Sequence, residues 1–207
     1  EGERLWNNKC PLYFIARRAQ FAEFAREIDS APGAAMSGGY FHHEGRRVHI
    51  VVPLYDFLSE KERQDRATNT LYHEGTHAFL QLVGNNVVLN RWLHEGMAQF
   101  IEFWCNRQNN RERNAIVNLL SEFVRTGNIL SWAEGQKRPA GGMDPQGYAF
   151  AWSRIMFLYD VFASDKSKLP KMVRLIKAGK REEQALEEVY GRKASELIPS
   201  TSPQAFA

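Results

Sequence analysis

The segment 67–83 constrains the fold more than any other, because it combines a long helical pattern with two histidines on its polar side. At 100° per residue, Leu71 and Leu82 fall within about 20° of each other and mark an apolar stripe. His73 and His77 fall at about 200° and 240° from Leu71, away from that stripe. The pattern therefore predicts a helix that packs one face on the core and opens the other face into a cleft.

The motif His73-Glu74-Gly75-Thr76-His77 carries the chemistry of this face. Two imidazoles four residues apart on a helix project the same way and can bind one metal ion. Glu74 lies beside them, where its carboxylate can take a proton from water activated by that ion. Three fixed positions in five residues arise by chance in many proteins, so the motif needs support from elsewhere in the chain.

That support comes from Glu95. Seventeen residues lie between it and His77. On the next helical pattern, Leu93 and Phe100 belong to the apolar side, whereas Glu95 points well away from it. Two histidines and one carboxylate leave a fourth position for water, as in catalytic zinc sites. His94 is the alternative third ligand, and it lies about 100° round the helix from Glu95, so both cannot bind one ion.

The pairing of this motif with Trp92-Leu93-x-Glu95-Gly96-x-Ala98 resembles the gluzincin metallopeptidases, and most of all the largely bacterial peptidase MA-like family. Thermolysin and the M1 aminopeptidases share the same plan. The resemblance covers the layout of residues 40–190 and is specific only over the two motif segments. It implies a Zn²⁺ cofactor, a peptide or protein substrate and hydrolysis of peptide bonds.

The resemblance also implies roles for individual residues. His73, His77 and Glu95 would be the zinc ligands, and Glu74 would be the general base and acid. Tyr148, in the first turn of a later helix, would donate a hydrogen bond to the oxyanion.

The sequence departs from the family pattern in two places, and the resemblance implies one further feature. Gln99 stands where thermolysin-like enzymes carry an Asp that orients a zinc-binding histidine, and an amide can still accept an imidazole N–H. The GxMEN motif of M1 exopeptidases is absent, which argues against an aminopeptidase and favours an endopeptidase or an unknown specificity. The strand expected at 48–52 would be the edge strand along the cleft.

The fold class expected is α+β and zincin-like, in one catalytic domain. A strand-rich part, 1–66, precedes a helical part, 67–198, and a tail, 199–207, with the cleft between the two parts. The expected strands are 10–16, 40–43 and 46–52, with a turn at 44–45 and a drier and a wetter face on the last strand. The expected helices are 17–28, 67–83, 91–107, 112–126, 145–162, 168–178 and 182–190; segments 30–39 and 133–143 are expected as loops, and 54–65 as a polar connection that could be helical.

Charge and composition exclude some partners. A formal net charge of +3 without a basic stripe argues against nucleic-acid binding. The sequence contains no run of about 18 apolar residues, which is the length that a membrane-spanning helix needs, so no membrane span is expected. Cys10 and Cys105 are expected to be free thiols, with one disulfide as the alternative. The chain begins without Met, so a secreted or periplasmic protein with its signal peptide removed is favoured, and the oligomeric state is unknown.

Two other functions compete with a peptidase. One is a zinc-binding, peptidase-like protein with a binding or regulatory role and little catalysis. The other is a structural zinc domain, which would need four protein ligands, often cysteines. His42, His43 and His49 form a histidine-rich hairpin, but neighbouring residues of a strand face opposite sides, so a second metal site is not expected there.

Overall fold

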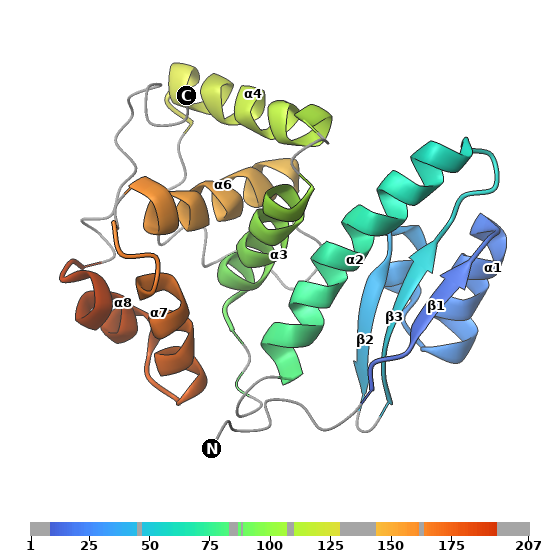
Figure 1. Ribbon diagram of the computed structural model, residues 1–207, viewed down its shortest axis with the longest axis horizontal. Helices are drawn as coiled ribbons and strands as arrows, with labels where there is room; N and C mark the ends of the chain where they lie inside the picture. The colour runs from blue at the N-terminus through green and yellow to red at the C-terminus, as the bar shows by residue number, and fades with distance from the viewer. Residues whose placement is uncertain are drawn as a thin grey trace.

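The computed structural model describes residues 9–44, 47–82, 87, 89–106, 110–128, 144–161 and 164–193. Its class is α+β, as expected: a small sheet with α1 on one side and α2 on the other, followed by a group of helices (Figure 1). The elements are β1 (Leu12–Ile15), α1 (Arg18–Glu23), β2 (Tyr40–Glu44), β3 (Arg47–Pro53), α2 (Glu60–Leu82), α3 (Arg91–Cys105), α4 (Asn110–Thr126), α6 (Pro145–Met156), α7 (Lys168–Lys177) and α8 (Glu182–Tyr190), with short helical turns η1 (Phe24–Ile28), η2 (Pro32–Met36) and η3 (Phe157–Val161).

The strand order β1-β3-β2 corrects one expectation about the cleft. β3 lies in the middle, parallel to β1 and antiparallel to β2, so β2 and not β3 is the edge strand beside α2. The register pairs Glu44 with Arg47, so Glu44 belongs to β2 and the turn expected at 44–45 is wrong; positions 45 and 46 lie outside the described residues. The hairpin itself is confirmed.

The expected wetter face of β3 is wrong, because both faces of this strand are covered. Val51 packs with Phe21 and Ala25 of the α1 and η1 segment, whereas Val52 packs with Ala78 of α2. Only the start of the strand, at Arg47, is exposed. A central strand between two helical layers is buried on both sides, even when its sequence contains polar residues.

The helix that carries the histidine motif begins seven residues earlier than expected. Ser59 and Glu62 form a capping box: the Ser59 N–H donates to Glu62 Oε2 at 3.0 Å, and the Glu62 N–H donates to Ser59 Oγ at 3.4 Å. The polar connection is therefore helical from Glu60 onward. Within the segment 30–39, which we expected to be a loop, η2 forms a short 3₁₀ helix.

The remaining helices confirm the expectation to within a few residues, and their packing explains part of the second motif. A Cβ atom at Gly96 would lie 2.5 Å from the Ala151 carbonyl oxygen, so only glycine lets α3 approach α6 this closely. Trp92 Nε1 donates to Glu182 of α8 at 2.9 Å, which connects α3 to α8. Asp144 caps α6 by accepting from the Gly147 N–H at 2.7 Å.

A buried polar cluster lies between the sheet and η1, and we call it the sheet cluster: Asp29, Tyr40, His42 and His49. The Tyr40 hydroxyl and His49 Nε2 donate to Asp29 Oδ2 at 2.7 and 2.8 Å, and the Asp29 side chain is fully buried. The His42 ring stacks on His49 with centroids 4.8 Å apart. Burial and the bond to Asp29 raise the pKa of Tyr40. His43, the next residue of β2, is exposed, so it lies apart from this cluster.

The cysteines are free, as expected: Cys10 is half-buried and Cys105 is exposed. Among the described residues, no helix has the length and apolar composition that a membrane span requires. The expected loop 133–143 and the tail 199–207 lie outside the described residues.

Candidate metal centre

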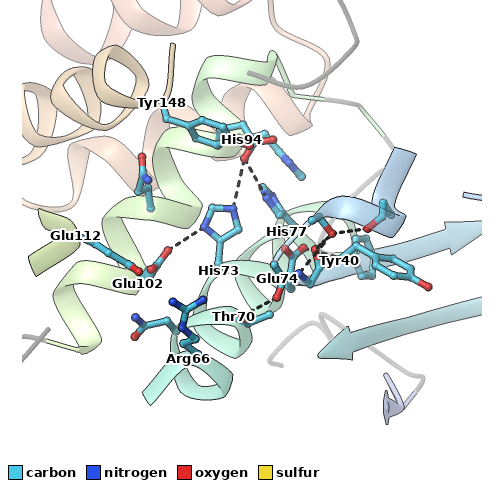
Figure 2. Close-up of a pocket in the computed structure, with 18 of the residues that line it drawn as sticks. Tyr40, Arg66, Thr70, His73, Glu74, His77, His94, Glu102, Glu112 and Tyr148 are labelled. Atoms are coloured by element: carbon cyan, nitrogen blue, oxygen red, sulfur yellow. Dashed lines mark hydrogen bonds and ion pairs between the residues drawn. The ribbon is translucent and has the colours of Figure 1, made fainter. Parts of the chain in front are cut away.

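The candidate site lies where α2 and α3 pack side by side in opposite directions (Figure 2). His94, near the start of α3, stacks on His77, while Glu102, within one turn of the end of that helix, lies beside His73. Glu95 sits between these contacts, so its carboxylate faces both motif histidines. The helical spacing that predicted two polar faces thus produces one shared site.

Three ligand atoms converge here. Glu95 Oε2 lies 3.4 Å from His73 Nε2 and 3.3 Å from His77 Nε2, and all three atoms lie within 4.8 Å of one another. These separations are longer than ordinary N–H···O hydrogen bonds. Glu95 Oε2 is buried without a hydrogen-bond partner, although buried carboxylate oxygens are normally paired. His73, His77 and Glu95 therefore form a group that could hold a metal ion.

The charge state of Glu95 suits a cation. Burial works against ionisation, but His73 and His77 outweigh that effect and hold the pKa of the carboxyl well below its usual range. Glu95 is thus an anion in a partly enclosed site, where a cation gains more from it than in water.

His94, the alternative third ligand, is not part of this group in the described structure. Its ring lies nearly parallel to that of His77, with centroids 4.4 Å apart and an interplanar angle of 12°. Burial lowers the pKa of His94 to about 4. The ring packs against one ligand side chain instead of joining the atoms that converge on Glu95.

Glu102 orients His73, a role that the sequence analysis assigned to Gln99. His73 Nδ1 lies 3.1 Å from Glu102 Oε2, and Glu102 is buried. The Gln99 side-chain oxygen is also buried but has no hydrogen-bond partner, so this expectation is wrong. Glu102 follows Glu95 by seven residues, which is two helical turns and therefore the same face, and this spacing could have identified it.

Glu74 lies on the β2 side of the group. Its Oε2 accepts a hydrogen bond from the Phe41 N–H at 2.9 Å. Burial raises the pKa of the Glu74 carboxyl, and the adjacent His73 and His77 oppose that rise. A carboxylate whose pKa is raised holds a proton more readily near neutral pH than a solvated one.

A cleft of about 840 Å³ opens over these residues, and Tyr148 lines it together with the group. Tyr148 comes from the first turn of α6, and in Figure 2 it lies on the side of the two imidazoles away from Glu74. Burial raises the pKa of Tyr148 to about 12, so its hydroxyl keeps its proton and is available as a donor.

The edge strand approaches the same cleft closely because of Gly39. A Cβ atom at this position would collide with the Thr70 side chain of α2. The Thr70 hydroxyl also donates to the Gly38 carbonyl at 3.2 Å. These contacts place the start of β2 against the helix that carries the histidines.

Comparison of the chain with protein-family profiles, with curated proteins and with solved structures finds no match.

Proposed function

We propose that this chain is a zinc-dependent peptidase of the gluzincin type. The observation that carries the proposal is the convergence of two imidazole nitrogens on one unpaired carboxylate oxygen, inside a cleft that Glu74 also lines. His73, His77 and Glu95 would hold the ion. The resemblance of both motif segments to the peptidase MA-like family supports the same assignment.

The distances suit zinc. A tetrahedral ion with ligands at about 2.0–2.1 Å has neighbouring ligand atoms about 3.3–3.4 Å apart. The two separations from Glu95 Oε2, 3.4 and 3.3 Å, agree with that geometry. Three protein ligands leave one position open, which is typical of a catalytic site, whereas a structural site has four. Neither cysteine belongs to the group, which argues against a structural zinc domain.

Three residues of the cleft would have different roles in hydrolysis. A zinc ion, when bound, lowers the pKa of coordinated water to about 7 and polarises a carbonyl group. Glu74 would take the proton of the attacking water and pass it to the leaving amine. Tyr148 would donate its hydroxyl hydrogen to the oxyanion of the tetrahedral adduct. Glu102 would hold His73 in the orientation that presents Nε2 to the ion.

The substrate class that fits is a peptide or protein. The absence of the GxMEN motif favours internal cleavage over removal of N-terminal residues. The edge strand β2, whose residues Tyr40 and Phe41 line the cleft, lies where an extended substrate backbone could pair with it.

Glu74→Gln tests the mechanism, because the amide has nearly the same shape but cannot accept the proton. The variant should bind one equivalent of zinc as the wild type does, while hydrolysis of an unfolded protein such as casein falls by about 10²- to 10⁴-fold. Glu60→Gln, an exposed position at the start of the same helix, is the matched control and should keep full activity.

Two results would contradict the proposal. Full hydrolysis by the Glu74→Gln variant would show that this carboxylate is not the base. A zinc-loaded wild type that cleaves none of a broad set of unfolded proteins and peptides would favour a binding or regulatory role instead.

A further inference from the structure

Arg91 enters the cleft from the first residue of α3, one helical turn before Glu95. Residues four apart on a helix share a face, so the guanidinium and the carboxylate lie on the same side. Arg91 Nε is 3.9 Å from Glu95 Oε1, the oxygen that does not face the histidines. Glu95 thus presents one oxygen to the candidate metal position and the other to an arginine.

This ion pair leaves hydrogen-bonding capacity on Arg91 unused. A separation of 3.9 Å is too long for a hydrogen bond. Arg91 Nε is nevertheless buried and has no hydrogen-bond partner. A guanidinium has five N–H donors in a planar fork that matches anionic oxygens, so an unpaired buried donor indicates capacity for a ligand.

Tyr148 supplies a second donor beside the first. The positive charge of Arg91 lies close enough to Tyr148 to oppose the rise in the pKa of the Tyr148 hydroxyl that burial causes. Both side chains line the cleft, one from α3 and one from α6. Two donors from different helices therefore line the same cleft as Glu95, and Figure 2 shows Tyr148 on the side of the two imidazoles away from Glu74.

We propose that Arg91 binds the negatively charged oxygen of the tetrahedral adduct together with Tyr148, which adds a second oxyanion donor to the site. This inference rests on the proposed peptidase function. When water adds to the substrate carbonyl, the new C–O bond displaces the π electron pair onto the carbonyl oxygen, and the water proton goes to Glu74. The oxygen returns its pair as the C–N bond breaks and the amine takes that proton. Arg91 stabilises the oxygen only while it carries the charge.

The experiment compares Arg91→Gln with Arg63→Gln. Arg63 is a suitable control because it also pairs with a glutamate on its own helix and its side chain is 34% exposed, against 32% for Arg91, but it does not line the cleft. Three quantities are measured on each zinc-loaded protein: the zinc dissociation constant, the affinity for a set of phosphinic peptides, and kcat and KM for casein-derived peptides. A phosphinic peptide carries a tetrahedral anion in place of the scissile amide.

Arg91→Gln should lower kcat by about 10²- to 10³-fold with little change in KM, the loss typical of one oxyanion donor. Affinity for phosphinic peptides should fall by a similar factor, because they carry the same charge at the same place. The zinc dissociation constant should stay unchanged, and Arg63→Gln should match the wild type in all three quantities. Arg91→Lys keeps the charge without the planar fork, so its kcat and its affinity for phosphinic peptides should lie between those of the wild type and of Arg91→Gln. Arg91→Lys replaces Arg91→Gln in the experiment if Arg91→Gln does not fold.

Two results would overturn the inference while the peptidase stands. One is unchanged phosphinic-peptide affinity in an Arg91→Gln variant. The other is a loss of zinc affinity that accounts for the whole loss of activity, which would show that Arg91 only orients Glu95. A wild type that binds zinc but neither cleaves peptides nor binds phosphinic peptides would instead contradict the proposed function itself.

Discussion

Two buried clusters of histidines and carboxylates occur among the residues that the structure describes, and they differ in the partners of their polar atoms. In the sheet cluster, one oxygen of Asp29 accepts from both Tyr40 and His49, so donors and acceptor match. In the candidate metal centre, His73 and His77 face an oxygen of Glu95 that has no hydrogen-bond partner. The shared carboxylate oxygen is therefore hydrogen-bonded in the sheet cluster and has no hydrogen-bond partner in the candidate metal centre, although His42 Nε2 of the sheet cluster is also buried without a partner.

This contrast indicates which feature of a group of histidines and carboxylates marks it as a candidate metal site. Composition does not distinguish the clusters, since each has two histidines and a carboxylate. Geometry does: in the candidate metal centre two imidazole nitrogens lie 3.4 and 3.3 Å from a carboxylate oxygen that has no hydrogen-bond partner, and this group could hold a metal ion. In the sheet cluster the shared carboxylate oxygen instead accepts hydrogen bonds of normal length.

The largest expected effect separates the clusters by zinc affinity. His77→Ala should weaken zinc binding by more than the roughly 10- to 100-fold that loss of an outer partner typically causes, because it removes a direct ligand. His49→Ala should leave zinc affinity unchanged. Titration against a chelator of known affinity measures both. Equal loss of zinc affinity in the two variants would contradict the assignment of zinc binding to the candidate metal centre alone.

The next effect concerns the residue that orients a ligand. Glu102→Gln should weaken zinc binding about 10- to 100-fold, because His73 loses the carboxylate that accepts from its Nδ1–H. Gln99→Ala should change zinc affinity little, since its oxygen makes no hydrogen bond to either histidine. A larger loss of zinc affinity in Gln99→Ala than in Glu102→Gln would show that Gln99, as the sequence suggested, orients the histidine.

These two residues also show how far sequence reasoning reaches. Helical periodicity identified His73, His77 and Glu95 as one polar face on each of two helices, and the structure brings the three together. It did not identify Glu102, because the resemblance directed attention to position 99 and the choice between two residues on α3 depends on how the helices pack.

The sheet was predicted less completely than the helices. Alternation along the segment 48–52 predicted a strand correctly, but strand order and the covering of both faces depend on contacts with α1 and α2 that no local pattern reports. The early start of α2 was predictable, since Ser59 and Glu62 have the spacing of a capping box.

A third effect should appear in stability rather than in metal binding. Asp29→Asn weakens the acceptor shared by Tyr40 and His49, and an impaired buried hydrogen-bond group costs about 1–3 kcal/mol of unfolding free energy. Zinc affinity should not change. Urea denaturation measures the loss, with Asp65→Asn, an exposed partner of Lys61, as the control of small effect. A wild-type midpoint for Asp29→Asn would show that the sheet cluster contributes no stability.

The smallest expected effect is a pH dependence in the sheet cluster. Burial lowers the pKa of His42, an effect that Asp29 and Glu44 oppose and that His49 and Arg47 reinforce. The unfolded chain therefore binds a proton on this ring at higher pH than the folded protein does. The free energy of unfolding should accordingly decrease as the pH falls through about 6.5.

His42→Gln should reduce that decrease, which urea denaturation on either side of about pH 6.5 would measure. His43→Gln, the exposed neighbour on the same strand, is the control and should keep the wild-type slope. An unchanged slope in the His42 variant would assign the pH dependence to another group.

X-ray absorption at the zinc edge, on protein loaded with one equivalent of zinc, would show which atoms bind the ion. Nitrogen and oxygen neighbours are expected at about 2.0–2.1 Å, with two imidazoles, one carboxylate and one exchangeable water. The imidazole contribution should fall by half in a His77→Ala variant that is forced to bind zinc at high concentration. A sulfur shell at about 2.3 Å, or an intact two-imidazole signal in that variant, would contradict this coordination.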